Sequence, residues 1–150
     1  MFRRSFLLIP ALFGLVALAG CSGGSSSGTS NSYAGVYNGT VTVVARDGVA
    51  SASETLPYTV TVSVDGGVNG SVPGASSGSC NQSLAPIPLS GNTASETQSF
   101  SCNINGVTCQ ANRNMKIVFG GSDASLSGTL VLTCPGRIDI TMSGYLKKVL

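Results

Sequence analysis

Residues 33–150 alternate between apolar and polar residues, most clearly through 100–104 and again through 107–111. Successive side chains of a strand point to opposite faces, so this period of two predicts strands with one buried face. The two segments flank Asn105-Gly106, the preferred pair for a two-residue type I′ turn. That turn places Cys102 directly opposite Cys109, and all apolar residues of the hairpin then share one face.

A second hairpin is predicted near the C-terminal end, where residues 126–134 and 138–146 both alternate around Pro135-Gly136. A two-residue loop would place Leu132 opposite Asp139 and set a charge against the apolar face. A three-residue loop over 135–137 aligns Leu132 with Ile140 instead. We therefore expect the three-residue loop.

The same register would bring Gly128 opposite Gly144. Two facing glycines are typical of a bend or twist that closes a sheet, and this is the interpretation we favour. The alternative is a gap that a ligand or another chain approaches closely.

Further strands are predicted from the same period. Valines 60, 62 and 64 run into a turn at 65–67 and return through 68–72, while 33–45 forms a long strand. Residues 115–119 share parity with 107–111, so one long bent strand is predicted there. Two prolines make 84–89 an edge strand at best. The count of seven to nine strands with local connections predicts an all-β domain, either a small antiparallel meander barrel or a two-sheet sandwich.

The run from Gly35 to Thr40 reads Gly-x-Tyr-x-Gly-Thr, and several later strands are rich in glycine. In these features the domain resembles small up-and-down barrels such as lipocalins and avidins. The likeness rests on six residues and on glycine content, and it assigns no family to the domain.

The first twenty residues have the layout of a signal peptide. Residues 1–4 form a short positive start with Arg3 and Arg4, and Phe6–Ala19 is an uncharged, almost wholly apolar run. A membrane-spanning helix needs ~20 such residues, so this run is too short to be one. Its length and position fit the apolar region of a secretory signal.

The apolar run ends in Leu18-Ala19-Gly20-Cys21, which resembles the lipobox of bacterial lipoproteins at every position. The resemblance implies a diacylglyceryl thioether on Cys21, cleavage before it, and acylation of the new amine. Two or more acyl chains, at ~0.8 kcal/mol per buried CH₂, give a lasting membrane anchor. The alternative is an ordinary secretory signal in which Cys21 occurs by chance.

The residues after Cys21 predict a tether. Residues 22–32 contain neither an apolar nor a charged side chain, so they cannot offset the entropy of ordering. Such a linker spans roughly 18 Å. The expected organisation is a signal peptide over 1–20, a lipidated Cys21 with linker over 21–32, and one β domain over 33–150. Ser22, where an Asp would favour retention in the inner membrane, favours the outer membrane if the host has one.

The four remaining cysteines are even in number and would lie in an oxidising compartment, which predicts two disulfides. The hairpin register favours Cys102–Cys109 together with Cys80–Cys134. Cys80–Cys102 with Cys109–Cys134 is the main alternative. A zinc site is not predicted, because the chain has no Cys-x-x-Cys pair.

Charge and composition exclude several function classes. Without Arg3 and Arg4, six basic residues balance six acidic ones, so the mature domain has no basic footprint for nucleic acid. The chain has no histidine, which removes the usual general base and a common metal ligand. Lys116 and Asp139 are expected to point outward, and the acidic residues are interpreted as surface charges. No catalytic residue, metal site or cofactor is predicted.

The sequence therefore predicts a non-catalytic lipoprotein of the cell envelope, attached to a membrane through Cys21 and serving as a structural or interaction module. Its partner would be an envelope protein. The alternative is a barrel that holds a small apolar ligand. A hydrolase ranks last, because it would need a buried Ser–Lys pair or a cleft with paired acids.

Overall fold

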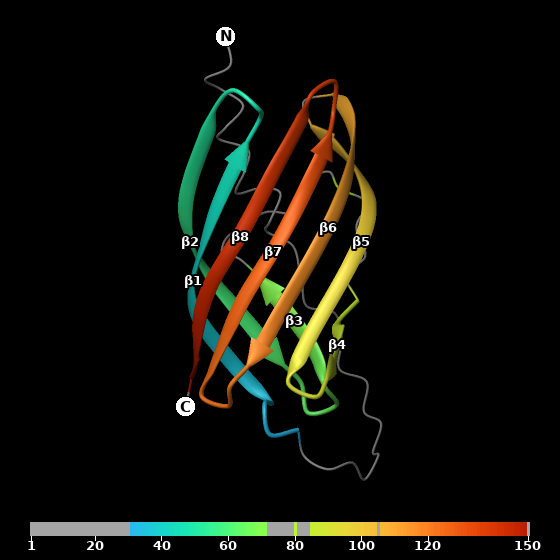
Figure 1. Cartoon of the computed structure of the whole chain (residues 1–150). Helices are drawn as coiled ribbons and strands as arrows, with labels where there is room; N and C mark the ends of the chain where they lie inside the picture. The colour runs from blue at the N-terminus through green and yellow to red at the C-terminus, as the bar shows by residue number, and fades with distance from the viewer. Residues whose placement is uncertain (1–30, 72–79, 81–84, 105, 150) are drawn as a thin grey trace.

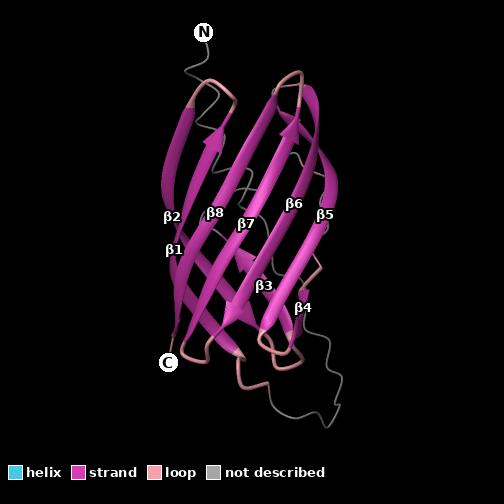
Figure 2. Ribbon diagram, viewed as in Figure 1, coloured by secondary structure: helices cyan, strands magenta, loops and turns pink. Residues whose placement is uncertain are grey.

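Eight antiparallel strands close into a barrel in the computed structural model (Figure 1). The structure describes residues 31–71, 80, 85–104 and 106–149, and every regular element within these ranges is a strand (Figure 2). The strands are β1 (Gly35–Arg46), β2 (Ser51–Val62), β3 (Gly67–Ser71), β4 (Ile87–Ser90), β5 (Thr93–Ile104), β6 (Val107–Phe119), β7 (Asp123–Thr133) and β8 (Arg137–Lys148).

Each strand pairs with the next along the chain, and β1 pairs with β8 to close the sheet. The prediction of an all-β meander is thus confirmed, and of its two architectures the protein adopts the barrel rather than the sandwich. An eight-stranded barrel is just wide enough for side chains to fill it. The hydrophobic core accordingly lies inside the barrel.

The alternation of the sequence becomes the division between inside and outside. On β7 the inward residues Ala124, Leu126 and Leu130 are buried, whereas Ser125 and Ser127 between them are exposed. The same holds around the barrel. Among the largest fully buried side chains are Tyr37, Phe119, Ile117, Leu130, Leu132, Ile140 and Leu146.

One end of the barrel is closed by aromatic side chains. The ring of Phe119 lies 5.9 Å from that of Tyr33 and 5.1 Å from that of Tyr37, measured between centroids. The Tyr37 hydroxyl donates to the carbonyl oxygens of Tyr33 and Gly121, at 2.9 and 3.2 Å. This is the end at which β1 begins and β8 ends (Figure 1).

The strand β2 is longer than the sequence predicts at its start and shorter at its end. Residues 51–58 show little alternation, yet they pair with β1 in one continuous register from Ser51 to Val62. Pro57 is tolerated there because β3 pairs only with residues 59–62, so a missing ladder hydrogen bond on that side costs little. Val64, which was expected in the strand, lies in the turn and is exposed.

The predicted register of the second hairpin is wrong by two residues. Its loop is indeed three residues long, but it consists of residues 134–136, so Leu132 lies opposite Ile138 rather than Ile140. A shift of two residues leaves every side chain on the same face, so the apolar pattern cannot distinguish the two registers. A turn hydrogen bond from Cys134 N to Gly136 O, 2.9 Å long, accompanies the observed loop.

Gly128 and Gly144 therefore do not face one another. Gly128 lies opposite Met142, and Gly144 lies between Leu126 of β7 and Val41 of β1. A Cβ atom on Gly144 would stand 2.6 Å from the Thr40 carbonyl oxygen and 2.7 Å from Val41 Cγ2. The glycine thus permits close approach of β1 and β8 where the barrel closes, and Val41 fills the space that a ligand would need.

The preferred disulfide pairing is also wrong. The protein forms both bonds of the alternative pairing instead. Bonds join Cys80 to Cys102 and Cys109 to Cys134, with Cα–Cα distances of 4.0 and 4.4 Å. Cys102 does lie opposite Cys109, as the turn predicts. However, each of them has a second neighbour, because Cys80 bridges to Cys102 and the β6–β7 register continues from Gln110–Thr133 to Cys109–Cys134.

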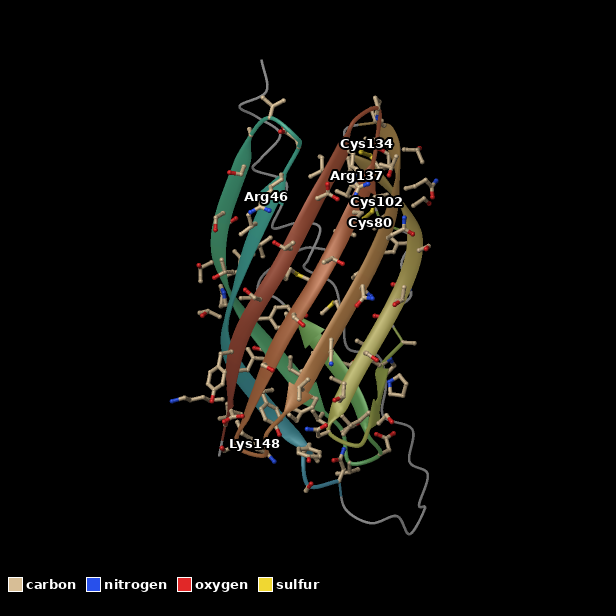
Figure 3. All side chains as sticks on the ribbon, in the orientation of Figure 1. Arg46, Cys80, Cys102, Cys134, Arg137 and Lys148 are labelled. Atoms are coloured by element: carbon tan, nitrogen blue, oxygen red, sulfur yellow. A yellow bond between two sulfur atoms is a disulfide. The ribbon has the colours of Figure 1, made fainter. Side chains whose placement is uncertain are left out.

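The four cysteines consequently form a single row across adjacent chain segments in the order 80, 102, 109, 134, with Cys102 on β5 and Cys109 on β6. Neighbouring strands are ~4.8 Å apart, so Cys80 and Cys134 are separated by roughly 14 Å, too far for the bond that the preferred pairing required. Figure 3 shows Cys80, Cys102 and Cys134 near the end of the barrel opposite Lys148. The disulfides and the aromatic closure thus lie at opposite ends.

Candidate functional site

Three polar side chains occupy inward positions near the middle of the barrel. Glu96 and Gln98 lie on β5 with the same parity as the buried Ala94 and Phe100, and Arg113 lies on β6 opposite Gln98. Side chains of equal parity on a strand share a face. The fold therefore directs an acid, an amide and a guanidinium into an otherwise apolar interior.

Arg113 joins the three into one cluster. Its Nη2 donates to Glu96 Oε2 at 2.8 Å and to Gln98 Oε1 at 2.9 Å. Its Cζ also lies 5.8 Å from the centroid of the Phe100 ring, within the range of a cation–π contact. The ion pair neutralises both charges, so the cluster adds no net charge to the core.

Tyr58 of β2 is buried within electrostatic reach of this cluster. Its ring lies over Gly70 of β3, where a Cβ would come within 3.0 Å of the ring carbons. Burial raises the pKa of Tyr58 to about 12, with the charge of Arg113 lowering it and that of Glu96 raising it. The phenol is therefore protonated at neutral pH and available as a hydrogen-bond donor.

Solvent reaches this cluster although it points inward. The side chains of Arg113 and Glu96 are 14% and 21% exposed, whereas Ala94 and Cys102 nearer the ends of β5 are sealed. This partial exposure means that the arrangement can supply hydrogen bonds to a polar ligand.

The interpretation of Glu96 as a surface charge is wrong. The apolar–polar alternation predicts the strand 93–104 only over its apolar half, and it does not assign the polar residues 95–99 to a face. Extending the parity of Phe100 backwards would have placed Glu96 and Gln98 inside, and the parity of Ala111 would have done the same for Arg113. Opposite charges on the inner faces of paired strands are the signal that could have found the site.

The other residues that the sequence singles out either point to the predicted face of their strand or lie outside the described residues. Lys116 and Asp139 point outward, and Asp139 pairs with Arg137 at 2.8 Å. Cys21 and the rest of its lipobox lie outside the described residues. Within the described ranges no helix is long and apolar enough to cross a membrane, and no group of three or more metal-binding side chains was found.

The buried phenol leads to a testable pH dependence. In the unfolded chain Tyr58 loses its proton near pH 10, whereas in the barrel it keeps it until about 12. The native state then binds more protons between these values, so stability falls as the pH rises from 10 to 12, by about 2 kcal/mol. Chemical denaturation of wild type and Tyr58→Phe over this range should show a difference that declines with pH. A constant difference would mean that Tyr58 titrates alike in both states.

Comparison with known proteins found no relative for this chain. No family model matches it, and neither a curated protein nor a solved structure is significantly similar to it.

Proposed function

We propose that the protein is a lipid-anchored lipoprotein of the bacterial envelope whose barrel is a non-catalytic interaction module. The observation that carries the proposal is the segment Leu18-Ala19-Gly20-Cys21, preceded by a basic start and a short apolar run. Acyl chains on Cys21 would hold the protein on a membrane, in the outer membrane of a host that has one. Two disulfides are typical of proteins outside the cytoplasm and support this location.

The arrangement of the chain ends is consistent with such a tether. Lys148 Nζ donates to the Ser32 carbonyl oxygen at 3.3 Å, and Val149 N donates to Val36 O at 2.7 Å. The linker predicted over 21–32 would therefore join the barrel at its aromatic end, and the disulfide end would face away from the membrane. The turns between β1 and β2, β5 and β6, and β7 and β8 lie at that distal end (Figure 1).

Replacement of Cys21 tests the anchor. Because a Cys21→Ser precursor cannot receive the thioether, we expect it to lose acyl labelling and to leave the membrane fraction almost completely. Ser22→Ala is the matched control, since it alters the neighbouring residue without removing the acceptor sulfur, and it should stay with the membrane. Acyl labelling or membrane retention of Cys21→Ser equal to that of the control would overturn the proposal.

A second candidate, a ligand-binding barrel, is favoured by the partly exposed cluster of Glu96, Gln98 and Arg113. The cluster supports a ligand with a polar group, because buried polar side chains are best satisfied by hydrogen bonds. A wholly apolar ligand receives less support, since Val41 occupies the space beside Gly144 and Met142 and Met115 occupy that beside Gly128. Native mass spectrometry of protein purified from its own membrane would detect such a ligand, and its loss in Arg113→Met would assign it to this cluster.

A further inference from the structure

The row of four half-cystines leaves one adjacent pair unbonded. Disulfides join the outer neighbours, Cys80 to Cys102 and Cys109 to Cys134, while the inner neighbours Cys102 and Cys109 are cross-strand partners without a bond between them. Directly opposite residues on one face of an antiparallel pair have Cβ atoms ~4.5–5.5 Å apart. The two inner sulfurs are thus close enough to exchange partners after a small movement.

We propose that this row is a thiol–disulfide relay, in which opening either disulfide yields a Cys102–Cys109 disulfide and frees both Cys80 and Cys134. The proposal goes beyond the anchoring function and does not depend on it. Its premise is the order of the cysteines across the strands, which puts a potential nucleophile next to each disulfide.

Accessibility determines which sulfur is attacked first. Cys102 and Cys109 are 1% and 0% exposed, whereas Cys80 and Cys134 are partly exposed. A dithiol reductant can therefore reach the outer sulfur of either bond more easily than the inner one. Attack on the outer sulfur expels the inner sulfur as a thiolate, and the thiolate is the form that attacks disulfides.

The exchange balances in atoms and electrons. When a dithiol attacks Cys80, a mixed disulfide forms and Cys102 leaves as a thiolate. That thiolate attacks Sγ of Cys109, a Cys102–Cys109 bond forms, and Cys134 leaves and takes a proton from water. The second thiol of the reductant then releases Cys80 and the reductant becomes a disulfide, so two electrons have moved in all. Attack on Cys134 leads by the mirrored steps to the same product.

One reduction would thereby release two positions at the distal end. Cys80 loses its bond to β5, and Cys134 in the β7–β8 loop loses its bond to β6, while the β5–β6 hairpin gains a bond of its own. The two freed thiols are the partly exposed ones, so the reduced form would present two reactive groups where the oxidised form presents none.

Removal of an outer cysteine isolates the exchange step. In Cys80→Ser, Cys102 loses its native disulfide partner. The relay nevertheless predicts that N-ethylmaleimide labels mainly Cys134, and that the peptide map contains a Cys102–Cys109 disulfide. In Cys134→Ser we likewise expect the label mainly on Cys80 rather than on Cys109. Label confined to Cys102 in the first variant and to Cys109 in the second would overturn the proposal.

The wild-type protein provides a measurement that does not depend on how the variants fold. After partial reduction with limiting dithiothreitol and an acid quench, the two-electron-reduced form should carry alkylated Cys80 and Cys134. Labels on both cysteines of one native pair would contradict the relay. The double variant Cys80→Ser/Cys134→Ser tests whether the inner sulfurs can reach one another. If Cys102 and Cys109 of this variant form no disulfide in air, the proposal is also contradicted.

Discussion

Gly144→Ala is expected to lower the free energy of unfolding by about 3 kcal/mol, because the added Cβ would collide with the backbone of β1. The new Cβ would stand 2.6 Å from the Thr40 carbonyl oxygen and 3.1 Å from Val41 Cα. Both are backbone atoms of β1, so neither can rotate away as a flexible side chain would. The strands that close the barrel would have to separate locally, at the cost of ladder hydrogen bonds.

Gly136→Ala is the matched control for this experiment. Gly136 lies in the β7–β8 loop, and a Cβ there would meet nothing within 4 Å. We expect its free energy of unfolding, measured in urea, to stay within about 0.5 kcal/mol of the wild-type value. Equal midpoints for the two alanine variants would mean that the β1–β8 seam can widen freely, and the close approach at Gly144 would then not be required for closure.

The β5–β6 hairpin shows what the sequence determines unaided. A two-residue turn fixes the register by itself, so the pairing of Cys102 with Cys109 was predictable to the residue. The β7–β8 hairpin lacks such a turn. Its alternatives differ by two residues and bury the same side chains, so only the tertiary structure separates them.

The disulfide pairing could not be predicted from one hairpin, because it depends on the register of two neighbouring strand pairs. Cys109 has neighbours on both sides, and the β6–β7 pairing that brings it to Cys134 follows from the position of the turn at 120–122. The polar cluster was within reach of the sequence, because parity alone points Glu96 and Arg113 inward. The general expectation that charged residues lie on the surface conceals it, and that expectation fails where two opposite charges can pair.

The reason for such a pair inside the barrel can be tested by removing one charge or both. Arg113→Met leaves the Glu96 carboxylate without its guanidinium in a largely apolar surrounding, and we expect a loss of about 3 kcal/mol, less than for a fully buried pair because both side chains are partly exposed. Denaturation in urea at neutral pH measures the loss. Lys116→Met is the control, since that side chain points outward.

The double variant Arg113→Met/Glu96→Met is expected to recover most of that loss, because two apolar side chains replace the pair without leaving a charge unpaired. Recovery would mean that stability alone does not explain a charged pair in the core, and it would strengthen the case that the cluster binds a polar ligand. If the double variant is instead as unstable as Arg113→Met, the hydrogen bonds from Arg113 to Glu96 and Gln98 hold β5 and β6 in place, and the cluster is a structural feature of the barrel.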